Sequence, residues 1–210
     1  MAMRIGIIGA GHIGGTLARL FVSVGHEVAV SNSRGPETLE GLVTELGDRA
    51  RAMTAQDAAS FGDLVVVSVP FGRYLELPTD GLAGKVVIDT NNYYPSRDGH
   101  FPELDTDRTT SSELLQAHLP GTRVVKAFNA INWKTLRDGG RPSADPERIG
   151  IPISGNDEVA KRIVAALIDQ IGFDAVDAGS LARGGRKHQP GTPVYTTELR
   201  ARELRARLAA

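Results

Sequence analysis

Three glycines near the start of the chain have a spacing that suits the binding of a phosphate group. Gly9, Gly11 and Gly14 form a GxGxxG pattern directly after the apolar run 4–8 and directly before a stretch with helical periodicity. In such a turn the first glycine permits the sharp bend, the second lets a pyrophosphate approach the backbone, and the third lets the helix pack closely on the strand. This position favours a phosphate turn over an ordinary glycine turn. We therefore predict a dinucleotide site formed by Gly9, Gly11, His12, Ile13 and Gly14.

The residues after the second expected strand indicate which dinucleotide is preferred. A site for NAD usually carries Asp or Glu there, about 20 residues after the glycines, to bind the ribose hydroxyls. This chain has hydroxyls, an amide and a guanidinium instead, which would bind a 2′-phosphate that a carboxylate repels. A plain polar loop is the alternative. The predicted phosphate-binding residues are Ser31, Asn32, Ser33 and Arg34, and the predicted cofactor is NADP(H).

Further candidate residues follow the later strands, because ligands of parallel α/β sheets bind at the carboxyl ends of the strands. The candidates for cofactor binding are Val69, Pro70 and Phe71, then Thr90, Asn91 and Asn92, and finally Ala130. Phe71 either covers the dinucleotide or packs in the core, and the amides of the second group could hold the nicotinamide carboxamide. No residue is assigned as catalytic with certainty, and no metal site is predicted. The candidates for orienting the nicotinamide ring are Asn129, Ala130 and Ile131.

Strand and helix patterns alternate along the chain, and this alternation places the candidates at one edge of a sheet. The expected strands span 4–8, 27–31, 51–54, 64–69, 86–89, 124–128, 149–154 and 173–177. The expected helices span 12–24, 36–46, 55–61, 110–119, 132–137, 157–171 and 196–208, with loops at 91–109 and 179–193. The pattern predicts an α/β fold with a Rossmann-type, doubly wound, mostly parallel sheet and a C-terminal helix. We expect one compact domain over 1–210, with the dinucleotide half at about 1–120.

Composition and charge exclude several other classes of protein. The 24 Lys and Arg residues against 25 Asp and Glu give a net charge of -1, so we expect no nucleic-acid partner. The absence of cysteine excludes disulfides, thiolate nucleophiles and cysteine-ligated zinc. No apolar run is long enough to cross a membrane, and the first residues lack a signal-peptide pattern. We therefore expect a cytoplasmic protein with no membrane partner.

Several segments together resemble the coenzyme F420-dependent NADP oxidoreductases, over most of the chain. They are RIGIIGAGHIGGTLA, SNSR, VVSVPFG, VIDTNN, VVKAFNAI, DAGSLA and PGTPVY. The glycine loop is common to many dinucleotide proteins, whereas the combination of SNSR, VKAFN and PGTPVY is more specific. The resemblance implies hydride transfer between NADPH and the deazaflavin coenzyme F420. Both cofactors carry their own reactive carbon, so the protein would mainly orient them. The alternatives are an NADPH-dependent reductase of another small acceptor (a flavin, an imine or a carbonyl) and a non-catalytic NADPH-binding sensor.

Three charged features leave alternatives open. Lys126 could donate a proton to a carbonyl or imine, or it could form structural hydrogen bonds. The basic loop at 183–188, with Arg97, could bind the phosphate and acidic tail of F420, or it could be a solvated loop or a subunit contact. The last helix is amphipathic and is predicted to dock on the body of the protein or on a second subunit, which makes a homodimer the candidate assembly.

Overall fold

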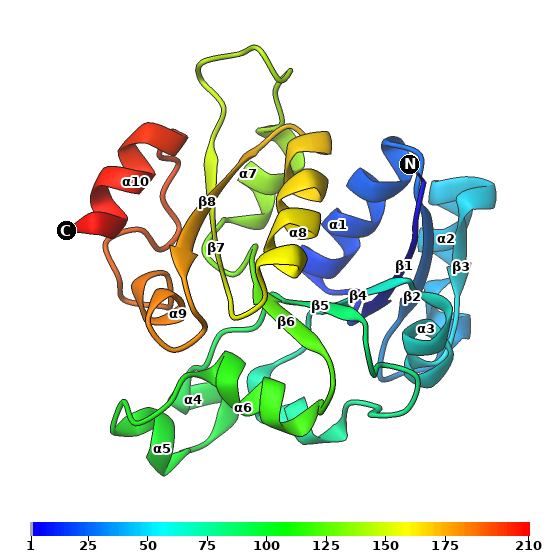
Figure 1. Ribbon diagram of the computed structural model, residues 1–210. Coiled ribbons are helices and arrows are strands. Elements are labelled where there is room, and N and C mark those ends of the chain that lie inside the picture. The colour runs from blue at the N-terminus through cyan, green and yellow to red at the C-terminus, as the bar shows by residue number, and fades with distance from the viewer. Residues whose placement is uncertain (1) are drawn as a thin grey trace.

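Eight strands form one sheet in the computed structural model, which describes residues 2–210 (Figure 1). The strands are β1 (Arg4–Ile8), β2 (Glu27–Ser31), β3 (Ala50–Ala52), β4 (Leu64–Val67), β5 (Val86–Asp89), β6 (Arg123–Lys126), β7 (Gly150–Gly155) and β8 (Asp174–Gly179). Their order is β3-β2-β1-β4-β5-β6-β7-β8. All neighbouring pairs are parallel except β6 and β7, which are antiparallel. The predicted Rossmann-type, mostly parallel sheet is confirmed.

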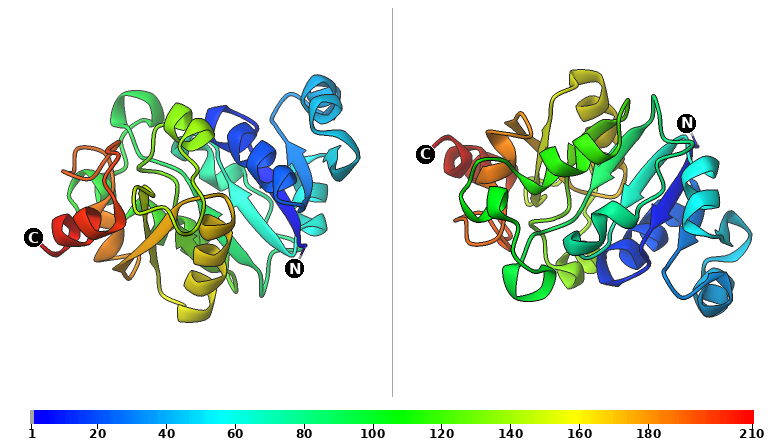
Figure 2. Two further views of the ribbon diagram at one scale, coloured as in Figure 1. Left: turned by 90° about the horizontal axis from the view of Figure 1, so that it is seen from above. Right: turned by 90° about the horizontal axis from the view of Figure 1, so that it is seen from below.

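Helices cover both faces of this sheet, as the views from above and below show (Figure 2). They are α1 (His12–Ser23), α2 (Glu40–Leu46), α3 (Ala55–Phe61), α4 (Pro95–Asp98), α5 (Pro102–Asp105), α6 (Ser111–His118), α7 (Trp133–Asp138), α8 (Glu158–Gln170), α9 (Gly184–Lys187) and α10 (Ala201–Ala209). One core cluster contains apolar side chains of α1, α7 and α8, and a second contains side chains of α3 and α6. The sheet is therefore buried between two layers, which explains the continuous apolar runs of β4 and β5.

Short helices account for most differences from the predicted elements. The segment at 91–109, predicted as a loop, contains α4 and α5, each of which begins at a proline. Proline at the first helical position fixes a helical φ, but four residues are too few to show helical periodicity. The segment at 179–193 likewise contains α9. The helix expected at 36–46 begins with one 3-10 turn, Pro36–Leu39, before α2.

The last helix starts later than predicted and packs on its own chain. It begins at Ala201, because Thr196 has a φ of +56° and its N–H donates to the carbonyl of Ala130 at 2.8 Å. Leu204 and Leu208 are buried against Val176 of β8. Of the two predicted alternatives for this helix, docking on the body is observed, and a homodimer stays a prediction.

The reversal at β7 brings the end of the chain back to the carboxyl edge of β5 and β6. β7 pairs with β6 only through its last two residues, with Ser154 opposite Lys126 and Gly155 opposite Val125. Gly179, the last residue of β8, lies opposite Ser154. β8 therefore ends level with the end of β6, and the chain that follows it passes beside the residues after β6.

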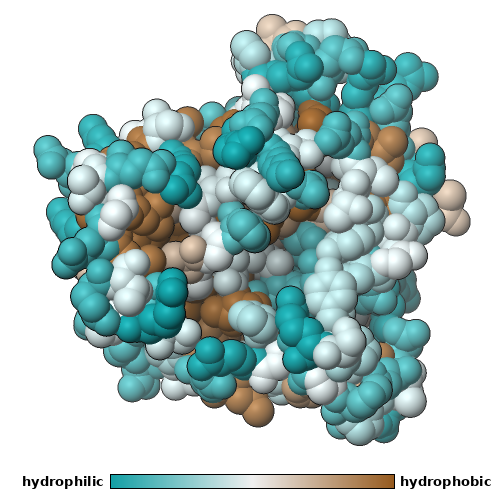
Figure 3. Space-filling view, turned by 180° about the vertical axis from the view of Figure 1, so that it is seen from behind, coloured by the Kyte–Doolittle hydropathy of each residue, from teal (hydrophilic) through white to brown (hydrophobic). Residues whose placement is uncertain are grey.

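Polar residues predominate on the face seen in Figure 3, where apolar surface is confined to separate patches. The large apolar side chains that remain exposed within residues 2–210 are Val24, Leu75 and Val159. Over the same residues, each helix is too short or too polar to span a membrane.

Candidate nucleotide-binding and active site

A pocket of about 470 Å³ lies at the carboxyl ends of β1, β2 and β4. Its volume falls within the range of about 300–1,000 Å³ that is typical of small-molecule sites. Seven of the predicted cofactor-binding residues line it, namely Gly9, Gly11, Asn32, Ser33, Arg34, Val69 and Pro70. The remaining lining residues are Ile8, Ala10, Ala55, Ser68, Arg73, Glu76, Leu77 and Pro78. The glycine turn and the turn after β2 thus face the same space, although 20 residues or more separate them in the chain.

Each glycine of the GxGxxG pattern has a different structural environment. Gly9 has a φ of +105°, and a Cβ there would lie 2.1 Å from the carbonyl oxygen of Ser68. A Cβ at Gly14 would lie 1.9 Å from the carbonyl oxygen of Gly9. A Cβ at Gly11 would meet no other atom of residues 2–210 within 4 Å. Gly9 and Gly14 are therefore required by the turn and its packing, whereas Gly11 keeps open the space in front of the helix.

The N-terminus of α1 supplies positive potential to this space. No side chain of the described residues caps it at Gly11, and its first turn contains no acidic residue. The first N–H groups of a helix lack partners within the helix and attract anions such as a pyrophosphate. His12 and Ile13 begin the helix beside the pocket without lining it, and the imidazole of His12 stacks on Trp133 with ring centroids 4.6 Å apart. The backbone of this turn thus fits a dinucleotide phosphate.

The turn after β2 differs from the prediction at one residue. Ser31 is fully buried, and its hydroxyl donates to the carbonyl of Ile7 at 3.1 Å, so it is not part of the pocket lining. Its inclusion among the phosphate-binding side chains is corrected, because the strand buries this face. Asn32 accepts from the N–H of Arg34 at 2.9 Å and donates to Thr38 at 2.8 Å. These bonds shape the turn and leave Ser33 and Arg34 exposed at the pocket.

Arg73 and Glu76 are pocket residues that the prediction missed. Their side chains form an ion pair in the 3-10 helix Phe71–Glu76, with Arg73 Nε 3.0 Å from Glu76 Oε2. The hydrogen bond from Arg73 lowers the pKa of the Glu76 carboxyl. The signal available in the sequence was a basic residue three positions after Pro70, at the end of β4.

Phe71 packs in the core and does not cover the pocket. Phe71 is 1% exposed. Its ring stacks on that of Tyr74 with the centroids 4.8 Å apart, and it meets the ring of Phe101 edge to face with the centroids 5.3 Å apart. Of the two alternatives for this residue, core packing is the one observed. The aromatic cluster instead anchors the 3-10 helix that carries Arg73.

The predicted residues after β5 are mostly engaged within the fold. The Thr90 hydroxyl donates to the carbonyl of Val67 at 3.1 Å, and Asn91 Oδ1 accepts from the N–H of Val69 at 3.0 Å. Asn91 is 3% exposed, and its Nδ2 has no hydrogen-bond partner among residues 2–210. Neither Thr90 nor Asn91 lines the pocket. They hold the end of β4 in place beside it.

Asn92 and Asn129 join the ends of β5 and β6 to the C-terminal segment. Asn129 Nδ2 donates to Asn92 Oδ1 at 3.0 Å and to the carbonyl of His188 at 2.8 Å. Asn92 Nδ2 donates to the carbonyl of Asn129 at 2.8 Å and to the Tyr195 hydroxyl at 3.3 Å. Tyr195 in turn bonds to Tyr94, and burial together with this bond raises the pKa of Tyr195. The side chain of Asn129 therefore faces the interior, and Asn129 can meet a ligand only through its backbone.

The residues around Asn129 form a buried, strained turn. Phe128 is fully buried and has a φ of +62°, in the left-handed region that residues other than glycine rarely adopt. Ala130 and Ile131 are 3% and 7% exposed. Backbone strain of this kind persists only where surrounding contacts hold it, and it is frequent at ligand sites. This turn is the candidate nicotinamide side of the site.

Lys126 forms structural hydrogen bonds. It is 1% exposed, and its Nζ donates to the carbonyl of Asn91 at 2.9 Å and to the Ser112 hydroxyl at 3.1 Å. The carboxylate of Asp89 lies 3.4 Å from the same atom. Of the two alternatives for Lys126, the structural one is observed.

Of the alternatives for 183–188, a basic mouth is not formed as a group. His188 is fully buried, and burial together with the charge of Lys126 lowers its pKa to about 3, so it is neutral. Arg186 lies 3.3 Å from the carboxylate of Asp107. Arg97 pairs with Asp98 at 2.8 Å. Lys187 Nζ donates to the carbonyl of Leu208 at 2.5 Å, and Arg183 is exposed.

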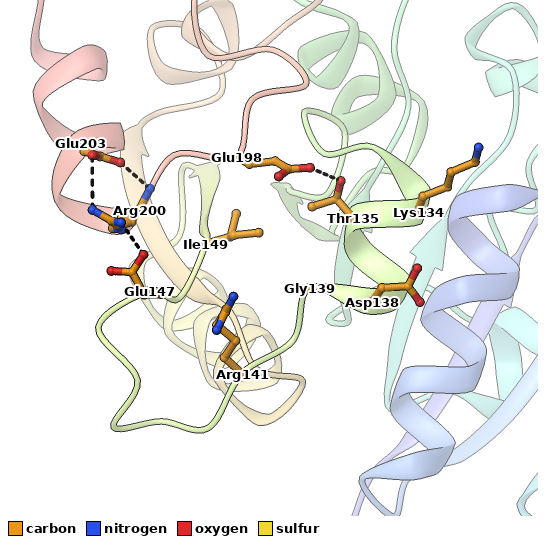
Figure 4. A pocket seen from close by; sticks show the side chains of 10 residues that line it. All are labelled: Lys134, Thr135, Asp138, Gly139, Arg141, Glu147, Ile149, Glu198, Arg200 and Glu203. Atoms are coloured by element: carbon orange, nitrogen blue, oxygen red, sulfur yellow. Dashed lines mark hydrogen bonds and ion pairs between the residues drawn. The ribbon is translucent and has the colours of Figure 1, made fainter.

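A second pocket of about 550 Å³ lies between α7 and α10, away from the predicted residues (Figure 4). Its lining is charged, with Arg200 between Glu147 and Glu203, and Thr135 donating to Glu198 at 2.6 Å. Charges of both signs neutralise one another there, so its larger volume does not indicate a site for an anionic dinucleotide. Across residues 2–210, no group of three or more metal-ligating side chains is placed to hold a metal ion.

Comparison with known proteins supports an oxidoreductase. Residues 4–93 match the family described as "NADP oxidoreductase coenzyme F420-dependent". A hypothetical protein from Sinorhizobium meliloti is 32% identical, with 95% of each chain covered and a TM-score of 0.80. A protein from Arthrobacter sp. FB24, whose name proposes an F420-dependent NADP reductase, is 27% identical, with 94% of this chain and 99% of that chain covered and a TM-score of 0.76.

More distant structures share the fold alone. A reductive aminase from Aspergillus terreus is 19% identical, with 90% of this chain and 59% of that chain covered and a TM-score of 0.62. No curated protein matches the chain. The family match contains the glycine turn, the turn after β2 and the end of β4, which build the pocket. The chain therefore belongs to the coenzyme F420-dependent NADP oxidoreductases and is an NADP-dependent oxidoreductase.

Proposed function

We propose that this protein transfers a hydride between NADPH and the deazaflavin coenzyme F420. The observation that carries the proposal is that the matched family segment forms the pocket with the open space at Gly11. The name of the Arthrobacter protein, similar over nearly its whole length, supports the same acceptor. In the reaction, NADPH loses one hydride, and the deazaflavin gains that hydride and one proton from solvent.

The pocket residues would bind the adenosine and pyrophosphate parts of NADPH. The free N–H groups of the turn at Gly11 would donate to the pyrophosphate. Asn32, Ser33 and Arg34 would bind the 2′-phosphate, and the turn that they form contains no carboxylate to repel it. The one acidic lining residue, Glu76, is already paired with Arg73. This arrangement supports NADPH over NADH.

The buried turn around Asn129 would support the nicotinamide ring. It follows β6 at the same edge of the sheet as the pocket, and in sheets of this order the ligand extends along the carboxyl ends of the strands. Bringing two reactive rings into contact in a fixed geometry is the main contribution that a protein makes to hydride transfer between cofactors. A rigid backbone against one face of the ring meets that need.

The test is to mix the purified protein with NADPH and oxidised F420 and to follow the absorbance bands of both. We expect both bands to fall together, with NADPH a better donor than NADH. Turnover of NADPH with a flavin, an imine or a carbonyl but not with F420 would replace the acceptor and keep the rest of the assignment. Tight NADPH binding with no turnover of any acceptor would indicate a sensor and contradict the proposal.

A further inference from the structure

His188 lies far from the dinucleotide motif in sequence, but it forms direct hydrogen bonds with Asn129 in the turn after β6. It is 0% exposed, and its ring contacts two side chains. Nδ1 is 2.9 Å from Asn129 Oδ1, and Nε2 is 2.8 Å from the Ser154 hydroxyl. Its carbonyl also accepts from Asn129 Nδ2 at 2.8 Å. His188 therefore holds both polar atoms of the Asn129 amide.

The hydrogen bonds determine the protonation of this ring. Asn129 Nδ2 donates to two carbonyl-type oxygens, Asn92 Oδ1 and the His188 carbonyl, which fixes the orientation of the amide. Asn129 Oδ1 is then an acceptor, so His188 Nδ1 carries the proton and Nε2 accepts from the Ser154 hydroxyl. Both ring nitrogens and all three polar positions of the Asn129 amide are satisfied in this single arrangement.

The turn that Asn129 belongs to needs such support. Phe128 has a φ of +62° in a fully buried position, a conformation that is unfavourable for a residue other than glycine. The carbonyls of Asn129 and Ala130 are both held from outside the turn, by Asn92 Nδ2 and by the N–H of Thr196, each at 2.8 Å. Hydrogen bonds from Asn92, His188 and Thr196 together thus fix the backbone of 127–131.

We propose that His188 is a positioning residue for hydride transfer, which acts through Asn129 to hold the backbone of 127–131 against the nicotinamide ring. This inference rests on the proposed function, because it places the nicotinamide at that turn. His188 itself does not meet the cofactor, since it is fully buried and neutral. Its neutral state also keeps an additional positive charge away from Lys126, which lies in the same buried region.

Two amide substitutions separate the two bonds of the ring. The amide nitrogen of His188→Asn lies near the position of Nδ1 and can keep the bond to Asn129 while losing Ser154. The longer side chain of His188→Gln places its amide near the position of Nε2, so it can keep Ser154 while losing Asn129. The control is His26→Gln, at the other buried histidine, beside the start of β2. In the wild type, His26 Nδ1 accepts from the N–H of Met3 at 3.0 Å, and Nε2 forms a hydrogen bond with Gln170 at 2.7 Å.

The variants are compared by kcat and KM with NADPH and F420, by NADPH affinity from calorimetry, by the nicotinamide fluorescence of bound NADPH and by melting temperature. We expect His188→Gln to lower kcat by about ten- to a hundredfold and to change the fluorescence, because a shift of about 1 Å has this effect on hydride transfer. NADPH affinity should change little, because the phosphate-binding turns lie elsewhere. His188→Asn should recover most of kcat, and His26→Gln should lose stability alone.

Equal kinetic effects of His188→Asn and His188→Gln, or wild-type kcat and fluorescence in His188→Gln, would overturn the proposal. If His188→Gln does not fold, Asn129→Ser removes the same bond from the other side and should show the same low kcat, and wild-type kcat there would be decisive against it. The fluorescence of bound NADPH needs no acceptor. A failure of wild-type turnover with F420 would therefore refute the proposed function and leave the positioning role open to its own test.

Discussion

The two ends of the candidate cofactor site lie at one edge of one sheet but are built in different ways. At the ends of β1, β2 and β4, the site is an open pocket whose lining comes from turns directly after the strands. At the ends of β5 and β6, it is a closed turn held by side chains from a distant part of the chain. Asn129 and His188 are 59 residues apart, and Asn92 and Tyr195 are 103 apart.

The difference separates binding from positioning. The open end uses backbone N–H groups and flexible cations, which suit the flexible, charged phosphates of a dinucleotide. The closed end uses buried and mutually satisfied hydrogen bonds, which suit a ring that must be placed within a fraction of an ångström. Substitutions at the open end should therefore change affinity, and substitutions at the closed end should change rate and stability.

The largest effect is expected from Gly11→Val. Gly11 has a φ of -73° and free space around its Cβ position, so the variant should fold with a melting temperature close to that of the wild type. The valine side chain would occupy the space of the pyrophosphate, and affinity for both NADPH and NADH should fall by at least about 100-fold, or ~2.7 kcal/mol. Calorimetric titration checks this result. Gly14→Ala is the contrasting variant, because its Cβ would clash with the carbonyl of Gly9 and the fold itself should fail.

A smaller loss of affinity is expected from Arg34→Ala. The guanidinium is exposed at the pocket and would form a charged hydrogen bond to the 2′-phosphate. The Kd for NADPH should rise by about ten- to a hundredfold. The Kd for NADH, which lacks that phosphate, should change little. An equal loss for both dinucleotides would show that Arg34 does not recognise the 2′-phosphate.

At the closed end, acid should destabilise the protein through His188. Its pKa is lowered from 6.5 to about 3 in the fold, so between these values the unfolded chain binds a proton that the folded chain does not. The free energy of unfolding should therefore fall as the pH is lowered through this window, by on the order of 1–2 kcal/mol at pH 5. Urea unfolding from pH 7 to pH 4 measures this. His188→Asn, which cannot titrate, should show a flatter profile, and parallel profiles would contradict the assignment.

The smallest effect is expected from Glu76→Gln at the open end. The substitution releases Arg73 from its ion pair, and both side chains are about half exposed. An additional free cation at the pocket should strengthen NADPH binding by about two- to threefold at low salt. The gain should disappear in high salt and in the double variant with Arg73→Gln. A gain that persists without Arg73 would mean that Glu76 itself repels the cofactor.

The sequence placed seven lining residues at the open end because the determinants of their position are local. The GxGxxG turn, the turn at Asn32–Arg34 and the residues Val69 and Pro70 each follow their strand directly, and a parallel sheet brings such ends together. The capping box of α6 is local in the same sense, because its residues Thr110 and Glu113 are three positions apart. The errors at this end concern the face of the chain that a side chain occupies, as for Ser31 and Phe71, and the pocket residues Arg73 and Glu76, which were missed.

The closed end could not be predicted in the same way. Asn129 was correctly placed after β6, but the inward direction of its amide depends on His188. From the sequence, His188 was interpreted as part of a basic loop. In the fold it is buried as a neutral ring between Ser154 and Asn129. The residues that flank His188 in the sequence contain no pattern that would predict either contact.

By itself the sequence determined the alternation of strands and helices, the dinucleotide turn and seven of the fifteen residues that line the pocket. These features follow from backbone conformation and burial periodicity among near neighbours in the chain. Only the tertiary structure decided the reversal at β7, the return of 188–196 to the end of β6 and the neutral state of His188. These depend on which distant segments meet, and burial in that contact then selects the hydrogen-bond partners and the charge.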